Sequence, residues 1–244
     1  MARNREADDP RRRTLIGALT LGLLGPGLWT PDAAGQLFGD RPGRLASNRS
    51  IYRLRGEVTV NGTAATLQTI IRPGDTVKTG PGAEVIFVVG GQSMIMREGS
   101  TLTLEKEEQQ QESLLVRGLR LVSGALLNVS RDQKMALRTA NASIGIRGTG
   151  FYVEAEPQRT YFCTCYGVTD VASSSDPESR DTISASHHDR PVYVVNDAPR
   201  GRRIRNAPFI NHTDQELALI EALVGREPPF VFPKDSYGGP RREY

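Results

Sequence analysis

The chain has 244 residues, enough for one or two domains. Its 31 basic and 28 acidic side chains give a net charge of +3 without a dominant arginine-rich patch, which speaks against a nucleic-acid-binding protein. A hydrophobic content of 38% permits a packed core but excludes a polytopic membrane protein. The 25 glycines and 15 prolines predict many turns, as in an all-β fold.

Residues 1–35 have the organisation of an export signal. A basic run that includes Arg12 and Arg13 precedes an apolar stretch over residues 15–29, which glycine and proline interrupt, and small residues follow it. The stretch is shorter than the roughly 20 apolar residues of a spanning helix. It therefore favours a Sec or twin-arginine signal peptide, with an uncleaved anchor in the inner membrane as the alternative. We expect the remaining chain to lie in a bacterial periplasm.

The body of the chain is predicted to form a series of short strands. Residues 36–50 show no periodicity and predict a linker. From Ile51 onward, alternating or apolar segments are separated by turn signals such as Asn61-Gly62. The spacing predicts an all-β domain over residues 51–196, built as a β-roll, a solenoid or a sandwich. The expected strands include 76–79, 84–89, 119–122, 125–129, 151–154 and 192–195.

One helix is predicted near the C-terminus. Residues 197–225 combine a basic linker with this helix, for which Thr213 and Glu216 supply a capping box and Gly225 an end. Its apolar face comprises Leu217, Ile220, Leu223 and Val224. Residues 226–244 are rich in proline and glycine and predict a flexible tail.

Three stretches in the middle of the chain carry motifs that are specific in their order. They are residues 56–58 continuing to Pro-Gly-Asp-Thr-Val-Lys-Thr-Gly-Pro-Gly-Ala at 73–83, residues 94–104, and residues 139–151 with Ile-Arg-Gly-Thr-Gly-Phe at their end. Over about residues 51–172 the chain resembles the FecR-type periplasmic domain, here following a signal peptide as a stand-alone domain. The resemblance implies an all-β sensing or scaffolding domain without general catalytic residues, so we do not expect an enzyme.

The resemblance also implies the kind of partner. We expect the domain to bind another envelope protein, or a cell-wall or surface polymer, by strand addition or loop contact, as part of signal transduction. Direct contact with a sigma factor is not expected, because about ten residues before the apolar stretch are too few for a domain. The partner and the oligomeric state stay open.

Candidate contact residues are Arg147 and Thr149 in a glycine-rich turn, together with a polar loop over residues 173–180. The turn lacks the Lys-Ser/Thr pair and the following helix of a phosphate-binding loop. It is interpreted as a bulged turn at which glycine permits a positive φ.

The scarce cysteines and histidines suggest a second interpretation. Cys163 and Cys165 share one face of a predicted strand, with Cα atoms about 6.6 Å apart, near the upper limit for a disulfide. Together with His187 from a later strand they could bind Cu(I) or Zn(II), which would make the protein a metal-responsive periplasmic sensor. The alternative is that no cofactor binds and that both cysteines are buried or oxidised. A sugar-active enzyme would need clustered carboxylates on one sheet face, and the pattern places none there.

Overall fold

The computed structural model describes residues 42–106, 116–131 and 134–230. Within these ranges the chain forms a continuous sheet of fourteen strands and one helix, α2 (Asp214–Leu223). The all-β class and the C-terminal helix predicted from the sequence are confirmed. The predicted export signal, and the predicted tail beyond residue 230, lie outside the described residues.

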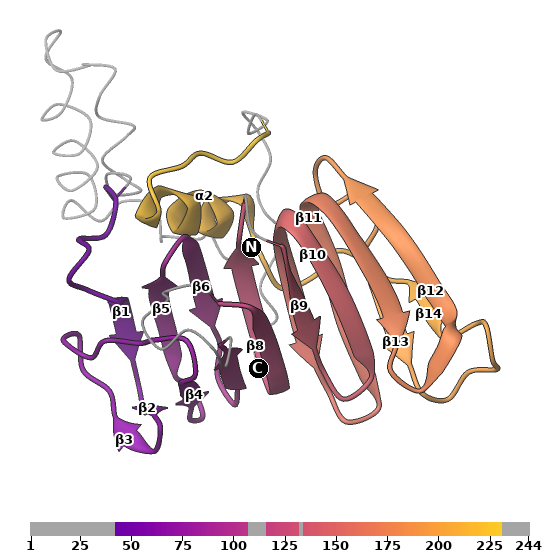
Figure 1. Ribbon diagram of the computed structural model, residues 1–244, viewed down its shortest axis with the longest axis horizontal. Coiled ribbons are helices and arrows are strands. Elements are labelled where there is room, and N and C mark those ends of the chain that lie inside the picture. Colours follow the sequence, from indigo (N-terminus) through magenta and orange to yellow (C-terminus); the bar gives the residue numbers. More distant parts are fainter. Residues whose placement is uncertain (1–41, 107–115, 132–133, 231–244) are drawn as a thin grey trace, which may run out of the picture. The chain divides into compact units, whose positions relative to one another are not determined.

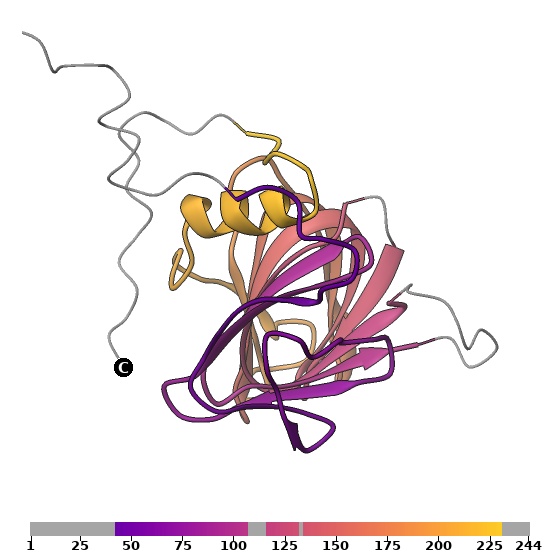
Figure 2. The same cartoon turned by 90° about the vertical axis from the view of Figure 1, so that its left-hand side faces the viewer.

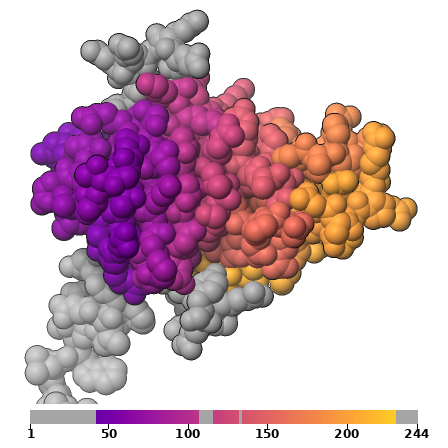
Figure 3. All heavy atoms as spheres, turned by 90° about the horizontal axis from the view of Figure 1, so that it is seen from below, coloured from indigo at the N-terminus to yellow at the C-terminus, as the bar shows by residue number. Residues whose placement is uncertain are grey.

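The sheet folds over itself into two layers (Figures 1 and 2). The first layer contains β3 (Thr63–Ala64), β2 (Val58–Val60), β4 (Thr76–Thr79), β7 (Thr101–Glu105), β9 (Lys134–Arg138) and β12 (Asp176–Ala185). The second contains β1 (Ile51–Arg55), β5 (Glu84–Val89), β6 (Gln92–Met96), β13 (Val192–Val195) and β14 (Ile204–Asn206). Three long strands contribute to both: β8 (Gly118–Val129), β10 (Ala142–Ala155) and β11 (Arg159–Ser173). Figure 3 shows the sequence order running along one face of the molecule.

The long strands bend at glycines. Gly124 in β8, Gly148 in β10 and Gly167 in β11 have φ angles of +83°, +67° and +94°. The first part of β8 pairs with β7, and the part after Gly124 pairs with β6 and β10. Separate short strands were expected here, but glycine lets one strand change layer without a turn. The expected glycine-rich turn is likewise a bulge inside β10, with register shifts on both sides of Gly150.

The main core lies between the two layers. Phe87, Leu102, Phe151 and Phe162 are fully buried in it, and the rings of Phe151 and Phe162 stack with centroids 5.6 Å apart. A second core covers the outer face of the second layer, where α2 packs against β6 and β8 (Figure 2). It includes Ile86, Ile95, Leu127 and Val129 from the sheet and Leu217, Ile220 and Leu223 from the helix.

Three segments differ from the organisation that the sequence predicted. The described end of the expected linker 36–50 packs on the helix end, where the Leu45 amide donates to the Leu223 carbonyl at 2.9 Å. The segment after residue 196 adds a further strand, β14, to the sheet. The expected loop over 173–180 is mostly strand, because β12 begins at Asp176 after a two-residue turn. A polar, serine-rich sequence can thus form a strand when its buried polar side chains are hydrogen-bonded, as Ser179 is to Asp176.

Candidate metal centre

The two cysteines lie on the outer face of the second layer. Cys163 and Cys165 stand two residues apart on β11 and point to the same face, as predicted. Both are free and fully buried in the outer core with Tyr152 and Tyr161. A fully buried thiol cannot reach a large substrate, so this placement favours ligation over nucleophilic chemistry.

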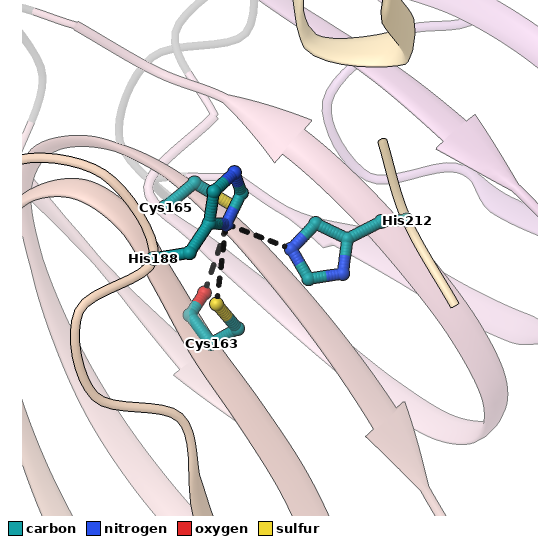
Figure 4. Close-up of side chains that lie close together, drawn as sticks. All are labelled: Cys163, Cys165, His188 and His212. Atoms are coloured by element: carbon teal, nitrogen blue, oxygen red, sulfur yellow. Dashed lines mark hydrogen bonds between the residues drawn. The ribbon is translucent and has the colours of Figure 1, made fainter. Parts of the chain in front are cut away.

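Two histidines meet these cysteines (Figure 4). His188 Nδ1 lies 3.5 Å from Cys163 Sγ and 3.1 Å from His212 Nε2. The four donor atoms of Cys163, Cys165, His188 and His212 all lie within 4.8 Å of one another. Tetrahedral Zn(II) holds sulfur at about 2.3 Å and nitrogen at about 2.0–2.1 Å, which places donors roughly 3.3–3.8 Å apart. The cluster therefore has the composition and nearly the dimensions of a closed four-ligand site.

The histidine expected from the sequence, His187, is not among these four. Its Nε2 lies 2.9 Å from Asp214 Oδ2, and its side chain is partly exposed. Strand β12 ends at Ala185, so strand alternation does not govern the two histidines that follow. His188 adopts a φ of +54°, and its backbone amide donates to the Cys165 carbonyl at 2.9 Å. This turn carries His188, rather than His187, to the cysteines.

The outward nitrogens of both histidines are held by acceptors. His188 Nε2 lies 3.0 Å from Asp214 Oδ1, and His212 Nδ1 lies 2.7 Å from the Ile210 carbonyl oxygen. A carboxylate and a carbonyl accept only, so each outward nitrogen carries the hydrogen and the inward nitrogens present lone pairs. Metal-ligating histidines almost always have such outer partners. Two lone pairs 3.1 Å apart repel, so the centre requires a cation between them, either a proton or a metal ion.

The electrostatics of the centre also favour positive charge. Burial would raise the pKa of the Cys163 thiol, but hydrogen bonds from Cys165, His188 and His212 outweigh it and hold this pKa well below its usual value. Burial and the neighbouring Cys163 raise the pKa of Cys165. Burial opposes protonation of His188, yet Asp214 and Cys163 raise its pKa to about 9. Without a metal ion, a proton shared near Cys163 and His188 therefore balances the charge.

The start of α2 positions the other two members of the site. Thr213 caps the helix: its Oγ1 accepts from the Glu216 amide at 3.2 Å, and its own amide donates to Glu216 Oε2 at 3.1 Å. The capping box predicted from the sequence is thus confirmed. The cap fixes the direction in which the chain enters the helix, which places His212 just before it and Asp214 just after it, both at the centre.

The two candidate contact residues on β10 have different surroundings. Arg147 is exposed and forms an ion pair with Asp170. Thr149 is fully buried, because the bulge at Gly148 turns the chain there. Arg147 thus lies at the surface and Thr149 in the interior.

Comparison with known proteins finds one family match. Residues 75–167 match the family model described as FecR protein. This part of the chain is therefore similar to a FecR domain, in agreement with a signalling-related envelope protein. No curated protein matches.

Two crystal structures, each of a candidate anti-sigma factor from Parabacteroides distasonis, are similar at 17% identity. The first has a TM-score of 0.41 over 54% of this chain and 58% of its own. The second has a TM-score of 0.43 over 67% of this chain and 82% of its own. This chain thus spans about half the length of the first. In the described part of the chain, no helix has the length and apolar character needed to cross a membrane.

The FecR match ends inside β11, at its bend. It includes Cys163 and Cys165 but neither His188 nor His212. The centre is therefore assembled from the family domain and from the segments that follow it.

Proposed function

We propose that the protein is an exported envelope signalling protein that binds a thiolate-preferring metal ion, Zn(II) or Cu(I), and responds to it. One observation carries the proposal: two thiols and two imidazole lone pairs converge on one buried point. The composition suits these two ions, since thiolate and imidazole select them. The expected export signal at residues 1–35 would place the site in the periplasm.

The closed donor set supports a binding role rather than an enzymatic one. Catalytic zinc sites keep one position open for water or substrate, whereas four protein ligands fill a tetrahedron. We expect the partner that distinguishes the metal-bound from the metal-free protein to be an envelope protein or a surface polymer. Exposed Arg147, and the edge strand β12, which pairs on one side with β11, are surfaces on which such a partner can dock.

The proposal is tested by metal uptake of the reduced, purified full chain. Titration with Zn(II), and with Co(II) as a coloured substitute, is expected to give one bound ion per chain with the visible bands of tetrahedral cobalt and a thiolate charge-transfer band. Cys163→Ser and His212→Gln each remove a ligand and should weaken binding strongly. His187→Gln is the matched control and should weaken binding far less, because His187 is not one of the four donors and contacts the centre only through Asp214.

Uptake that is absent in the wild-type chain would overturn the proposal. So would uptake that survives Cys163→Ser together with His212→Gln, because the ion would then bind elsewhere.

A smaller effect is expected from the outer partner of His188. Asp214→Asn keeps the shape of the side chain but removes the carboxylate that holds His188 Nε2 at 3.0 Å. The dissociation constant should rise about 10–100-fold with unchanged stoichiometry, as for other second-layer partners of metal ligands. Competition with a coloured chelator measures it. Asp75→Asn, which alters an exposed carboxylate bonded to the Asn61 side chain and the Arg72 amide, far from the centre, should leave the affinity unchanged.

A further inference from the structure

The four ligands come from three separate segments of the chain. Cys163 and Cys165 lie on β11, His188 lies in the turn after β12, and His212 lies in the segment that leads into α2. We define residues 207–230, which follow β14 and include α2, as the C-terminal cap. A bound ion would therefore join the cap directly to the sheet through His212.

We infer that metal occupancy fastens the C-terminal cap to the outer face of the sheet, and that loosening of the cap is the change by which the protein reports the loss of metal. The inference rests on the proposed function, since it assumes that the ion binds at the four residues. It adds the structural response that the metal controls.

Burial of the ligands makes this coupling necessary. The side chains of both cysteines and of His212 are fully buried, and His188 is 8% exposed. An ion from solvent can reach them only when part of the covering structure moves. His212 belongs to that cover, so opening removes a ligand and the closed state binds the ion more tightly. A ligand that binds one state stabilises it by mass action, here the fastened state.

The leading part of the cap is attached to the sheet at several points besides His212. In residues 207–213, the Ala207 amide donates to the Pro191 carbonyl at 2.9 Å and the Ile210 amide to Tyr161 Oη at 3.3 Å. The buried Asn211 accepts from Arg97 Nη2 at 2.9 Å through its carbonyl and donates to Glu154 through its side chain. Phe209 is partly exposed, whereas His212 is buried and stacks on Tyr152 with centroids 4.5 Å apart. His212 is the most deeply buried residue of this segment, and a bound ion would add a further attachment at that residue.

The far end of the cap is held independently of the centre. Glu221 forms an ion pair with Arg131 and accepts from the Tyr166 hydroxyl, and both partners belong to the sheet or the turn after β8. These contacts do not involve the four ligands. Loss of metal is therefore expected to loosen the cap mainly around His212, while Arg97 still holds Glu216 in the first turn of α2 and the end of the helix stays attached.

Hydrogen exchange of the full chain tests the inference by comparing the metal-free and Zn(II)-loaded forms. With free Zn(II) at 100 times its dissociation constant, amides of residues 207–217 should exchange about 100-fold more slowly than in the metal-free form. Amides of β4 and β7, which are remote from the centre, serve as the internal control. In His212→Gln, Zn(II) on the three remaining ligands should still protect the turn at residues 186–191 but no longer the cap.

The two proposals fail in different ways. If cobalt spectra show the ion on the cysteines and yet exchange of residues 207–217 is the same with and without metal, the fastening inference is overturned and the proposed function stands. If no ion binds the wild-type chain, the proposed function falls, and the inference with it.

Discussion

Gly124→Ala is expected to lower the free energy of unfolding by about 3 kcal/mol. Gly124 has a φ of +83°, and an alanine there costs roughly 1–2 kcal/mol in backbone strain. A Cβ at this position would lie 2.5 Å from the Cα of Ser100 and would also meet its Oγ. Crowding of a packed site costs a further 1–3 kcal/mol or so. Urea denaturation measures the loss, with a fall in Tm of about 6–12 °C.

The matched control is Gly62→Ala. Gly62 has nearly the same φ, +81°, but no atom lies within 4 Å of a Cβ built there. Only the strain of roughly 1–2 kcal/mol should remain. Equal losses in the two variants would show that the contact between the bend of β8 and Ser100 is not what demands glycine.

Glu221→Ala is expected to cost about 3 kcal/mol and to loosen α2. Glu221 is fully buried, accepts from Arg131 Nε at 3.1 Å and from Arg226 Nε at 2.7 Å, and receives the Tyr166 hydroxyl. Removing one member of a buried charge pair typically costs about 3–5 kcal/mol. The lower end applies because the two arginine side chains are 28% and 19% exposed and can recover some water.

An exposed pair provides the control for Glu221. Glu156 and Arg159 form an ion pair in which both side chains are 44% exposed. Glu156→Ala should cost less than about 1 kcal/mol. Chemical denaturation of both variants decides the matter, and a similar loss in each would mean that burial does not strengthen the contacts of Glu221.

The elements that could be predicted are those whose signals are local. Strands 76–79 and 192–195 have the predicted bounds, because the first alternates polar and apolar residues, the second is a short apolar run, and both lie between clear turn signals. The helix was predicted from its capping box and apolar face for the same reason. The lengths of β8, β10 and β11 were not predicted, because a glycine at which a strand bends cannot be distinguished in the sequence from a glycine in a turn.

The centre was only half predictable. The pairing of Cys163 with Cys165 follows from strand alternation alone. The choice of histidine depends on a turn held by Asp189, which sets His188 rather than His187 toward the sheet. His212 gave no local signal beyond its place before the helix cap. Its role depends on where α2 packs, which is a tertiary property.

The place where the family match ends has a consequence for assembly. Both cysteines lie within the FecR match and are synthesised first. The last donor, His212, is synthesised only after β12, β13 and β14. A chain that ends before His212 would contain both cysteines and still lack the fourth donor of the candidate metal centre. At the proposed site, binding of an ion by all four donors would therefore require that β11, the turn after β12 and the segment before α2 have packed together.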